Sequence, residues 1–281
     1  VPNEQHYPVA LQVAKAGKHV YTEKPIAHNL EDGLAIEKLQ KEFGVTVTVG
    51  HSARLLGGVQ EIKKRILNGE LGKVGFFEAN FSNERALELT PDTWRWYRDR
   101  APGGPLSQLA IHMFDVVNYL GETIVEASSI ASKLSPVGAE VDDQSMTLLK
   151  FSDGAIAYIG TCWTSPGIFA LRVFGSKALI HYEIDFGTWD TPEEIKNSST
   201  FYIQRGKDGF GKREVLSEPE TNMFTAELDI FAESCKSGQT SVLSAANGNE
   251  AVACVYAALS SIDKNGVSVK LSEVMESARN R

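Results

Sequence analysis

The stretch HVYTEKPIA, residues 19–27, indicates a short apolar strand that ends in a charged pair and a proline. Buried strands usually end in a turn of Gly, Asn, Asp or Ser, whereas this one ends in Glu23-Lys24-Pro25. Ligands of open α/β sheets bind outside the carboxyl ends of the strands, and Pro25 restricts the backbone that aims Lys24 there. A lysine at this place can hydrogen-bond a substrate oxygen and stabilise charge that develops on it. The alternative is a surface lysine paired with Glu23.

Strands and helices alternate on both sides of this stretch. A helical pattern precedes it and stops at Gly17, and an amphipathic stretch, residues 29–44, follows it with Asn29 as a candidate cap. The chain continues with the strand VTVTVGH (45–51), a helical pattern (57–72) and the strand KVGFFEANF (73–81). This alternation is typical of βαβ units, so it predicts a parallel sheet.

From about residue 122 the pattern changes to strands joined by tight turns. Ser152-Asp153-Gly154 is a hairpin signal between the strand-like segments DQSMTLLKF (143–151) and AIAYIGTCWT (155–164). Two helical patterns close the chain, at residues 224–238 and 248–263. The sequence therefore predicts a small parallel α/β part, followed by an open antiparallel sheet with helices, whose wet face suits a polar ligand or a partner subunit.

Composition and charge exclude several classes of protein. The chain has 281 residues, 42% of them hydrophobic and 23% charged, which is ordinary for a globular protein with a sizeable core. A formal net charge of -8 argues against a nucleic-acid binder, and no apolar run is long enough to span a membrane. Three scattered cysteines suit a reducing cytoplasm better than a disulfide framework or a zinc site.

A second stretch, APGGPLSQLAIHMFDVVNYLG at residues 101–121, adds a candidate acid/base group. Gly103-Gly104 let the backbone approach another group closely, and Pro105 suits a first helical turn. The spacing of four, three and four residues places polar side chains on one face of the helix, namely Gln108, His112, Asp115 and Tyr119. A histidine in such a stripe after a glycine hinge is a reasonable acid/base site, although helix histidines are more often structural.

Together the two stretches resemble the Gfo/Idh/MocA family of NAD(P)-dependent oxidoreductases. The resemblance lies in the strand that ends in Glu-Lys-Pro, in GHSAR (50–54), and in Gly-Gly-x-Leu with a histidine eight residues after the second glycine. It covers nearly the whole chain, including residues 1–27, NGELGKV (68–74), Trp94-Arg95, VFGSKALI (173–180) and residues 224–238. It implies an α/β fold with an α+β second domain. Residues 1–52 would be the C-terminal half of a Rossmann domain with a parallel sheet. Residues 53–281 would form a substrate-binding and oligomerisation domain around an open, mostly antiparallel sheet with flanking helices.

The resemblance also implies roles for individual residues. Lys24 would orient the reacting hydroxyl of a sugar, inositol or related polyol, and His112 would act as general base for its oxidation. The nicotinamide half of NAD or NADP would contact Pro2, Asn3, His6, Glu23, Lys24 and Pro25. Candidate substrate contacts are Arg95, Tyr97, Gln108 and Asp115.

The sequence departs from the family pattern in two ways. Gln108 stands where the family usually has aspartate, and a glutamine can neither carry a proton nor raise the basicity of a nearby histidine. The dinucleotide fingerprint G-x-G-x-x-G is absent, and with it about two βαβ units, roughly 60 to 70 residues. The sequence therefore indicates a family member without the N-terminal part of its Rossmann domain, either a portion of a longer protein or a natural truncation, in which the strand of residues 18–25 has an exposed edge.

Two alternatives to the dehydrogenase remain open at this point. One branch of the family contains glycosidases that use bound NAD for transient oxidation, and a truncated relative could bind sugars or dimerise without catalysis. No H-x-x-x-H or H-x-H pair supports a metal site. Since relatives assemble through the open sheet, we expect a homodimer or homotetramer in the cytoplasm, with a small-molecule substrate and neither nucleic acid nor membrane as a partner.

Overall fold

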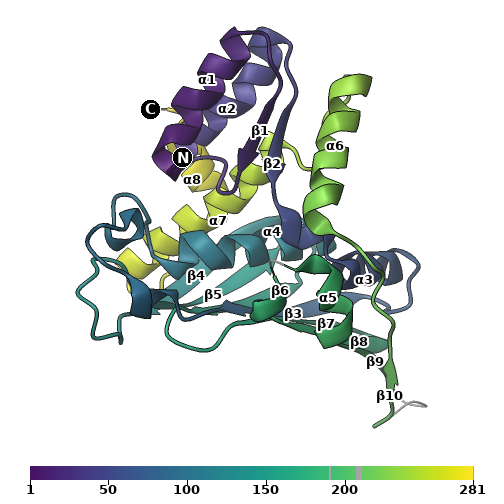
Figure 1. The fold of residues 1–281 in the computed structure, drawn as a ribbon. Helices are drawn as coiled ribbons and strands as arrows, with labels where there is room; N and C mark the ends of the chain where they lie inside the picture. Colours follow the sequence, from purple (N-terminus) through teal and green to yellow (C-terminus); the bar gives the residue numbers. More distant parts are fainter. Residues whose placement is uncertain (190, 207–210, 281) are drawn as a thin grey trace.

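The computed structural model describes residues 1–189, 191–206 and 211–280 (Figure 1). It contains a small parallel sheet of β1 (Val20–Glu23) and β2 (Val47–Gly50). The large sheet has the strand order β10-β9-β8-β7-β3-β6-β5-β4-β11. Its strands are β3 (Val74–Ser82), β4 (Ile124–Ser132), β5 (Gln144–Phe151), β6 (Ile156–Cys162), β7 (Ile168–Gly175), β8 (Ala178–Asp185), β9 (Thr200–Arg205), β10 (Arg213–Val215) and β11 (Val269–Lys270). Only β3 and β6 pair in parallel there, so the predicted fold class is confirmed.

The helices begin and end largely where the sequence predicts. In α2, the side chain of Asn29 accepts a hydrogen bond from the N–H group of Asp32, and Gly44 ends the helix in the left-handed conformation. The helices are α1 (His6–Lys15), α2 (Leu30–Phe43), α3 (Gly57–Leu67), α4 (Ile111–Leu120), α5 (Pro192–Ser198), α6 (Met223–Ser237), α7 (Ala245–Asp263) and α8 (Leu271–Arg279). None of the described helices is both long and apolar enough to cross a membrane.

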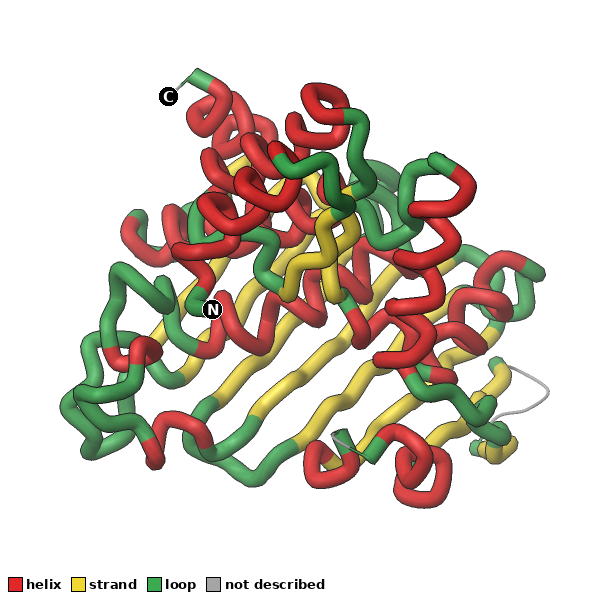
Figure 2. The backbone as a smooth tube through the Cα atoms, turned by 45° about the horizontal axis from the view of Figure 1, so that its top comes forward, coloured by secondary structure: helices red, strands yellow, loops and turns green. Residues whose placement is uncertain are grey.

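Helices cover one face of the large sheet and leave the other face open (Figure 2). The alternation in β5 shows why, since Thr147 and Leu149 point into the core while Met146 and Leu148 are 46% and 56% exposed on the outer face. The predicted hairpin at residues 152–154 joins β5 to β6. The outer face therefore carries an apolar surface, and the inner face holds the helices that reach the small sheet.

The long helix α7 connects the two sheets. It packs against α2 beside the small sheet and against α4 and β4 of the large one. Gly33 of α2 permits the close approach, because a Cβ atom there would lie 2.3 Å from Oδ1 of Asn249. A single buried apolar cluster extends over both sheets. The predicted domain division after residue 52 stays a prediction, since residues on both sides of it share this helix layer.

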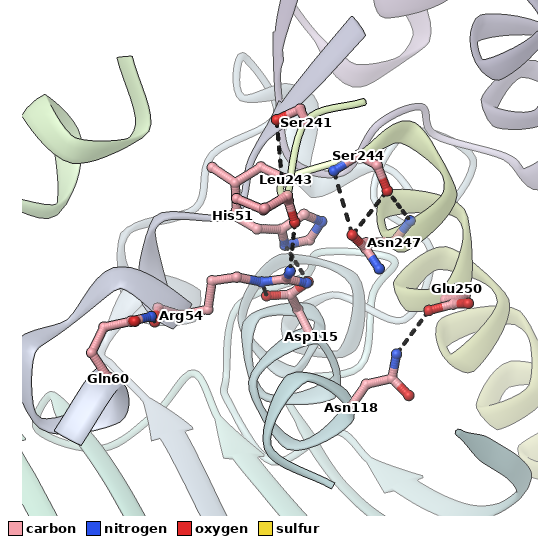
Figure 3. Close-up of polar contacts among 11 residues, drawn as sticks. His51, Arg54, Gln60, Asp115, Asn118, Ser241, Leu243, Ser244, Asn247 and Glu250 are labelled. Carbon is pink, nitrogen blue, oxygen red and sulfur yellow. Dashed lines mark hydrogen bonds and ion pairs between the residues drawn. The ribbon is translucent and has the colours of Figure 1, made fainter. Parts of the chain in front are cut away.

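A buried ion pair also joins the two parts of the fold (Figure 3). Arg54 follows β2 in the 3-10 turn of residues 52–55, and Asp115 lies in the middle of α4. The Nε and Nη2 atoms of Arg54 donate to the two carboxylate oxygens of Asp115, and its Nη1 atom donates to the carbonyl of Val242. Both side chains are at least 94% buried. The ion pair is therefore shielded from water, and its charged groups are hydrogen-bonded to each other.

We predict that Asp115→Asn lowers the free energy of unfolding by about 3 to 5 kcal/mol, because it leaves the buried guanidinium of Arg54 without a counter-charge. Urea unfolding at neutral pH measures the change. The matched control is Glu78→Gln, which removes the partner of Arg172 at an exposed pair on the large sheet and should cost less than about 1 kcal/mol. Equal losses in the two variants would contradict the structural role assigned to the buried pair.

Candidate active site

Lys24 directly contacts the second sequence stretch, residues 101–121. It follows β1, and its Nζ atom donates a hydrogen bond of 2.9 Å to the main-chain carbonyl of Gln108. Gln108 lies in a π-helical stretch, Leu106–Ala110, that leads into α4. Such stretches occur often at functional sites, because they shift main-chain carbonyls out of the α-helical hydrogen-bond pattern. The strand end and the glycine-hinged helix therefore converge, although 84 residues separate them in the chain.

His112 stands in the first turn of α4 and is 6% exposed. Its ring contacts those of Phe81 and Trp189, with centroid distances of 5.3 and 5.7 Å. Its Nδ1 atom is buried and has no hydrogen-bond partner among the described residues. Burial, together with the positive charge of Lys24, holds the pKa of His112 well below its ordinary value. The imidazole is therefore neutral at physiological pH, which is the state of a general base.

Lys24 is a partly buried ammonium with an altered pKa. Burial lowers its pKa to about 8, the charges of Arg95 and Arg85 act in the same direction, and Glu23 opposes them. The side chain is thus still mainly protonated at neutral pH. It can donate a hydrogen bond to an oxygen on which negative charge develops.

The residues predicted to contact the cofactor gather at the same end of β1. The Nδ1 atom of His6 lies 2.9 Å from the carbonyl oxygen of Pro25, and Asn3 and Pro25 line a common small cavity. Pro2 precedes the 3-10 turn of residues 3–5, and the exposed carboxylate of Glu23 accepts a hydrogen bond from the N–H group of Lys24. No cluster of His, Cys, Asp or Glu in the described residues could hold a metal ion.

Three of the predicted substrate contacts lie on or next to the loop that joins β3 to the π-helix. The guanidinium of Arg95 lies 4.2 Å above the ring of Trp94. The hydroxyl of Tyr97 donates to the carbonyl of Pro91. The side-chain amide of Gln108 is buried and donates to the hydroxyl of Ser107, so it is the main-chain carbonyl of Gln108 that Lys24 contacts.

The structure corrects the predicted role of Asp115 as a substrate contact. The sequence places it in the polar stripe with His112 and predicts a substrate contact, but its carboxylate is buried against Arg54 and both of its oxygens are occupied (Figure 3). Its place in the fold is therefore that of a structural ion pair. The helical spacing shows which residues share a face, but it cannot show which of them already have a partner from another element.

Two neighbours of His112 escaped the sequence analysis as site residues. His51 ends β2 within the GHSAR motif and is 1% exposed, with its Nδ1 atom 3.6 Å from Oδ1 of Asp115. Burial lowers the pKa of His51 to about 4. Trp189 belongs to an aromatic wall with Phe81, at a ring-centroid distance of 5.0 Å. The motif pointed to His51, whereas nothing in the sequence around Trp189 indicates that it faces α4.

Family models and solved structures agree with this geometry. Residues 1–51 match the model described as oxidoreductase family, NAD-binding Rossmann fold, and residues 59–181 match the GFO/IDH/MocA C-terminal domain. The crystal structure of a proposed NADPH-dependent oxidoreductase from Desulfitobacterium hafniense superposes with a TM-score of 0.93 at 33% identity. The match covers 98% of this chain and 79% of the other.

Curated relatives of this chain include dehydrogenases of sugars and inositols. Myo-inositol 2-dehydrogenase of Thermotoga maritima is 27% identical over 96% of this chain and 78% of its own length. Levoglucosan dehydrogenase of Pseudarthrobacter phenanthrenivorans is also 27% identical, over 56% of this chain, and the match spans 46% of that protein. Both family models match, and a solved structure is 33% identical over 98% of this chain, so the chain belongs to the GFO/IDH/MocA family of oxidoreductases.

Proposed function

We propose that the chain is the catalytic part of an NAD(P)-dependent dehydrogenase that oxidises a hydroxyl carbon of a sugar, inositol or related polyol. The observation that supports it best is the hydrogen bond between Lys24 and the π-helical stretch that precedes His112. It brings a fixed ammonium and a neutral imidazole to one place, and both are needed to oxidise an alcohol. The dehydrogenases among the relatives make this reaction class the natural one.

In this proposal Lys24 donates a hydrogen bond to the substrate hydroxyl and stabilises its developing alkoxide. The hydroxyl proton passes to Nε2 of His112, because Nδ1 is sealed inside the protein. NAD(P)⁺, held by the residues around the end of β1, would supply the acceptor for the hydride of the hydroxyl carbon. In the reverse direction His112 returns the proton. Trp189 offers a flat apolar surface beside His112 against which a sugar ring can pack.

The cofactor fits the described residues at its nicotinamide half. Asn3, His6, Glu23 and Pro25 surround the end of β1 next to Lys24, and the chain from residue 1 to 51 matches an NAD-binding family model. The choice between NAD and NADP stays open in this proposal. Because Gln108 gives His112 no carboxylate neighbour, we expect slower proton transfer than an aspartate at this position would allow.

We also propose a cytoplasmic homodimer or homotetramer that forms through the open face of the large sheet. That face exposes a group of apolar side chains from neighbouring strands, namely Ile130, Met146, Leu148 and Ile156. An apolar patch of this kind on a sheet suits a second copy of the chain. Cys162, Cys235 and Cys254 are free thiols.

Replacing Lys24 or His112 should lower the rate of the chemical step and so distinguish it from substrate binding. We predict that His112→Gln and Lys24→Met each lower kcat for polyol oxidation by about 100-fold or more, because proton transfer or charge stabilisation is lost. The natural gene product with NAD⁺ or NADP⁺ is the enzyme to test, and formation of the reduced nicotinamide is the readout. Lys64→Met, at a lysine whose side chain is 75% exposed, is the control and should retain full activity. An unchanged kcat in His112→Gln would refute the proposed base.

The pKa of Lys24 predicts the alkaline limb of the pH profile. If the protonated lysine is the active form, kcat/KM falls by about tenfold per pH unit as the pH rises above the pKa near 8, since the ammonium is lost there. In Lys24→Arg the charge persists, so the fall should move to a higher pH. A rate that continues to rise through pH 8 in the unmodified enzyme would instead make Lys24 a base and overturn its assigned role.

A further inference from the structure

Three cationic side chains surround the proposed reaction site. Lys24 extends from the end of β1 to the π-helical stretch. Arg85 lies in the 3-10 turn that directly follows β3, four residues after Phe81, whose ring packs against His112. Arg95 lies further along the same loop, in the 3-10 turn of residues 94–96. Two arginines thus lie on the loop that leaves the strand beside His112.

This loop is tied to the site at both ends. The N–H group of Ala86 donates to the carbonyl of Trp163, and the Trp163 ring lies 3.3 Å from the place of a Cβ atom on Gly104. Gly104 immediately precedes the π-helical stretch that Lys24 contacts. Near its other end, Arg100 lies 3.7 Å from Glu4, within the N-terminal segment that carries the predicted cofactor contacts. The loop therefore passes over the region where substrate and nicotinamide would meet.

Neither Arg85 nor Arg95 has a counter-charge. Within the described part of the chain no carboxylate lies within ion-pair distance of either guanidinium, and Arg95 only stacks on the ring of Trp94. Burial, together with the charge of Arg85, lowers the pKa of Arg95 to about 10, which still leaves it charged. Five other arginines form ion pairs with carboxylates, namely Arg54, Arg65, Arg100, Arg172 and Arg205, whereas Arg98, Arg213 and Arg279 form none among the described residues. Arg95 differs from the other unpaired arginines in that its guanidinium is partly buried, whereas Arg85 is exposed.

A partly desolvated cation without a partner is costly, and a bound anion removes that cost. The guanidinium fork matches the oxygens of a phosphate or a carboxylate and can bind them through two parallel hydrogen bonds. Nothing in a neutral polyol supplies the missing charge. The same loop geometry places such an anion within reach of Arg85 and Arg95, while the hydroxyl that reacts lies at Lys24 and His112.

We infer that the substrate is a sugar or polyol that carries an anionic group, a phosphate or a carboxylate, bound by Arg85 and Arg95 on this loop. The inference rests on the proposed dehydrogenase function for the position of the reacting hydroxyl. It goes beyond that function by naming the charge of the substrate and the two residues that select it.

The first test compares matched forms of one sugar with the natural gene product and NAD(P)⁺: glucose, glucose 6-phosphate and glucuronate. We expect kcat/KM for at least one anionic form to exceed that of the neutral sugar by about 100-fold, and the difference to shrink at high salt. Preference for the phosphate or for the uronate identifies the source of the anion. If the neutral sugar is oxidised as well as or better than both anionic forms, the inference fails.

The second test uses Arg95→Gln and Arg85→Gln, with Arg98→Gln as the matched control on the same loop, where the guanidinium donates only to the carbonyl of Glu140. Each site variant should raise KM for the anionic sugar by about 10- to 100-fold more than it raises KM for the neutral sugar. The control should leave both sugars unaffected. Equal losses on charged and neutral sugars, or no loss on either, would overturn the inference. Since Arg85 is exposed, its variant tests the idea even if Arg95→Gln fails to fold.

A binding measurement distinguishes this inference from the proposed function. Glucose 6-phosphate or glucuronate should raise the melting temperature of the unmodified protein more than glucose does, and Arg95→Gln should abolish the difference. If that shift occurs without hydride transfer to any sugar, the anion site stands and the dehydrogenase proposal fails. If neutral sugars are oxidised and neither anion shifts the melting temperature, the dehydrogenase stands and the anion site is refuted.

Discussion

The contact between the ammonium of Lys24 and the carbonyl of Gln108 is the interaction on which the candidate site depends. It joins the carboxyl end of a parallel strand of the small sheet to a π-helical stretch at the start of a helix, and that stretch packs against β3 and β6 of the large sheet. A hydrogen bond from a charged group in a partly buried setting is stronger than one at the surface. Because it holds Lys24 against the turn before His112, the two side chains share one small environment.

One cause, burial, shifts the pKa values of both Lys24 and His112 in this environment. Burial disfavours the charged form of each, so the imidazole stays neutral and the ammonium loses its proton more readily than in water. The positive charges of Lys24, Arg85 and Arg95 strengthen these shifts, and Glu23 only partly balances them. The site is therefore an electropositive region of an acidic protein, a setting that favours an oxygen on which negative charge develops.

Contacts outside the site hold the segments that carry Lys24 and His112 in place. The Arg54–Asp115 pair fixes the end of the small sheet to the middle of α4, one turn beyond His112 (Figure 3). The long helix α7 packs against helices beside both sheets. Since the two site segments come from these two parts, their separation is only as constant as the packing between the parts. The open face of the large sheet lies on the side away from the helices (Figure 1).

The sequence by itself determined the fold class, the helix ends at Asn29 and Gly44, the hairpin after β5, and Lys24 with His112 as the residues to examine. Those features depend on short-range interactions, because hydrophobic periodicity, turn residues and helix caps each act within a few residues of the chain. The tertiary structure alone decided that Asp115 is paired with Arg54, that the aromatic ring of Trp189 faces His112, and that Arg85 and Arg95 have no carboxylate within ion-pair distance in the described part of the chain. Each of these depends on which side chain from a distant segment arrives next to it, and neither spacing nor composition records such an encounter.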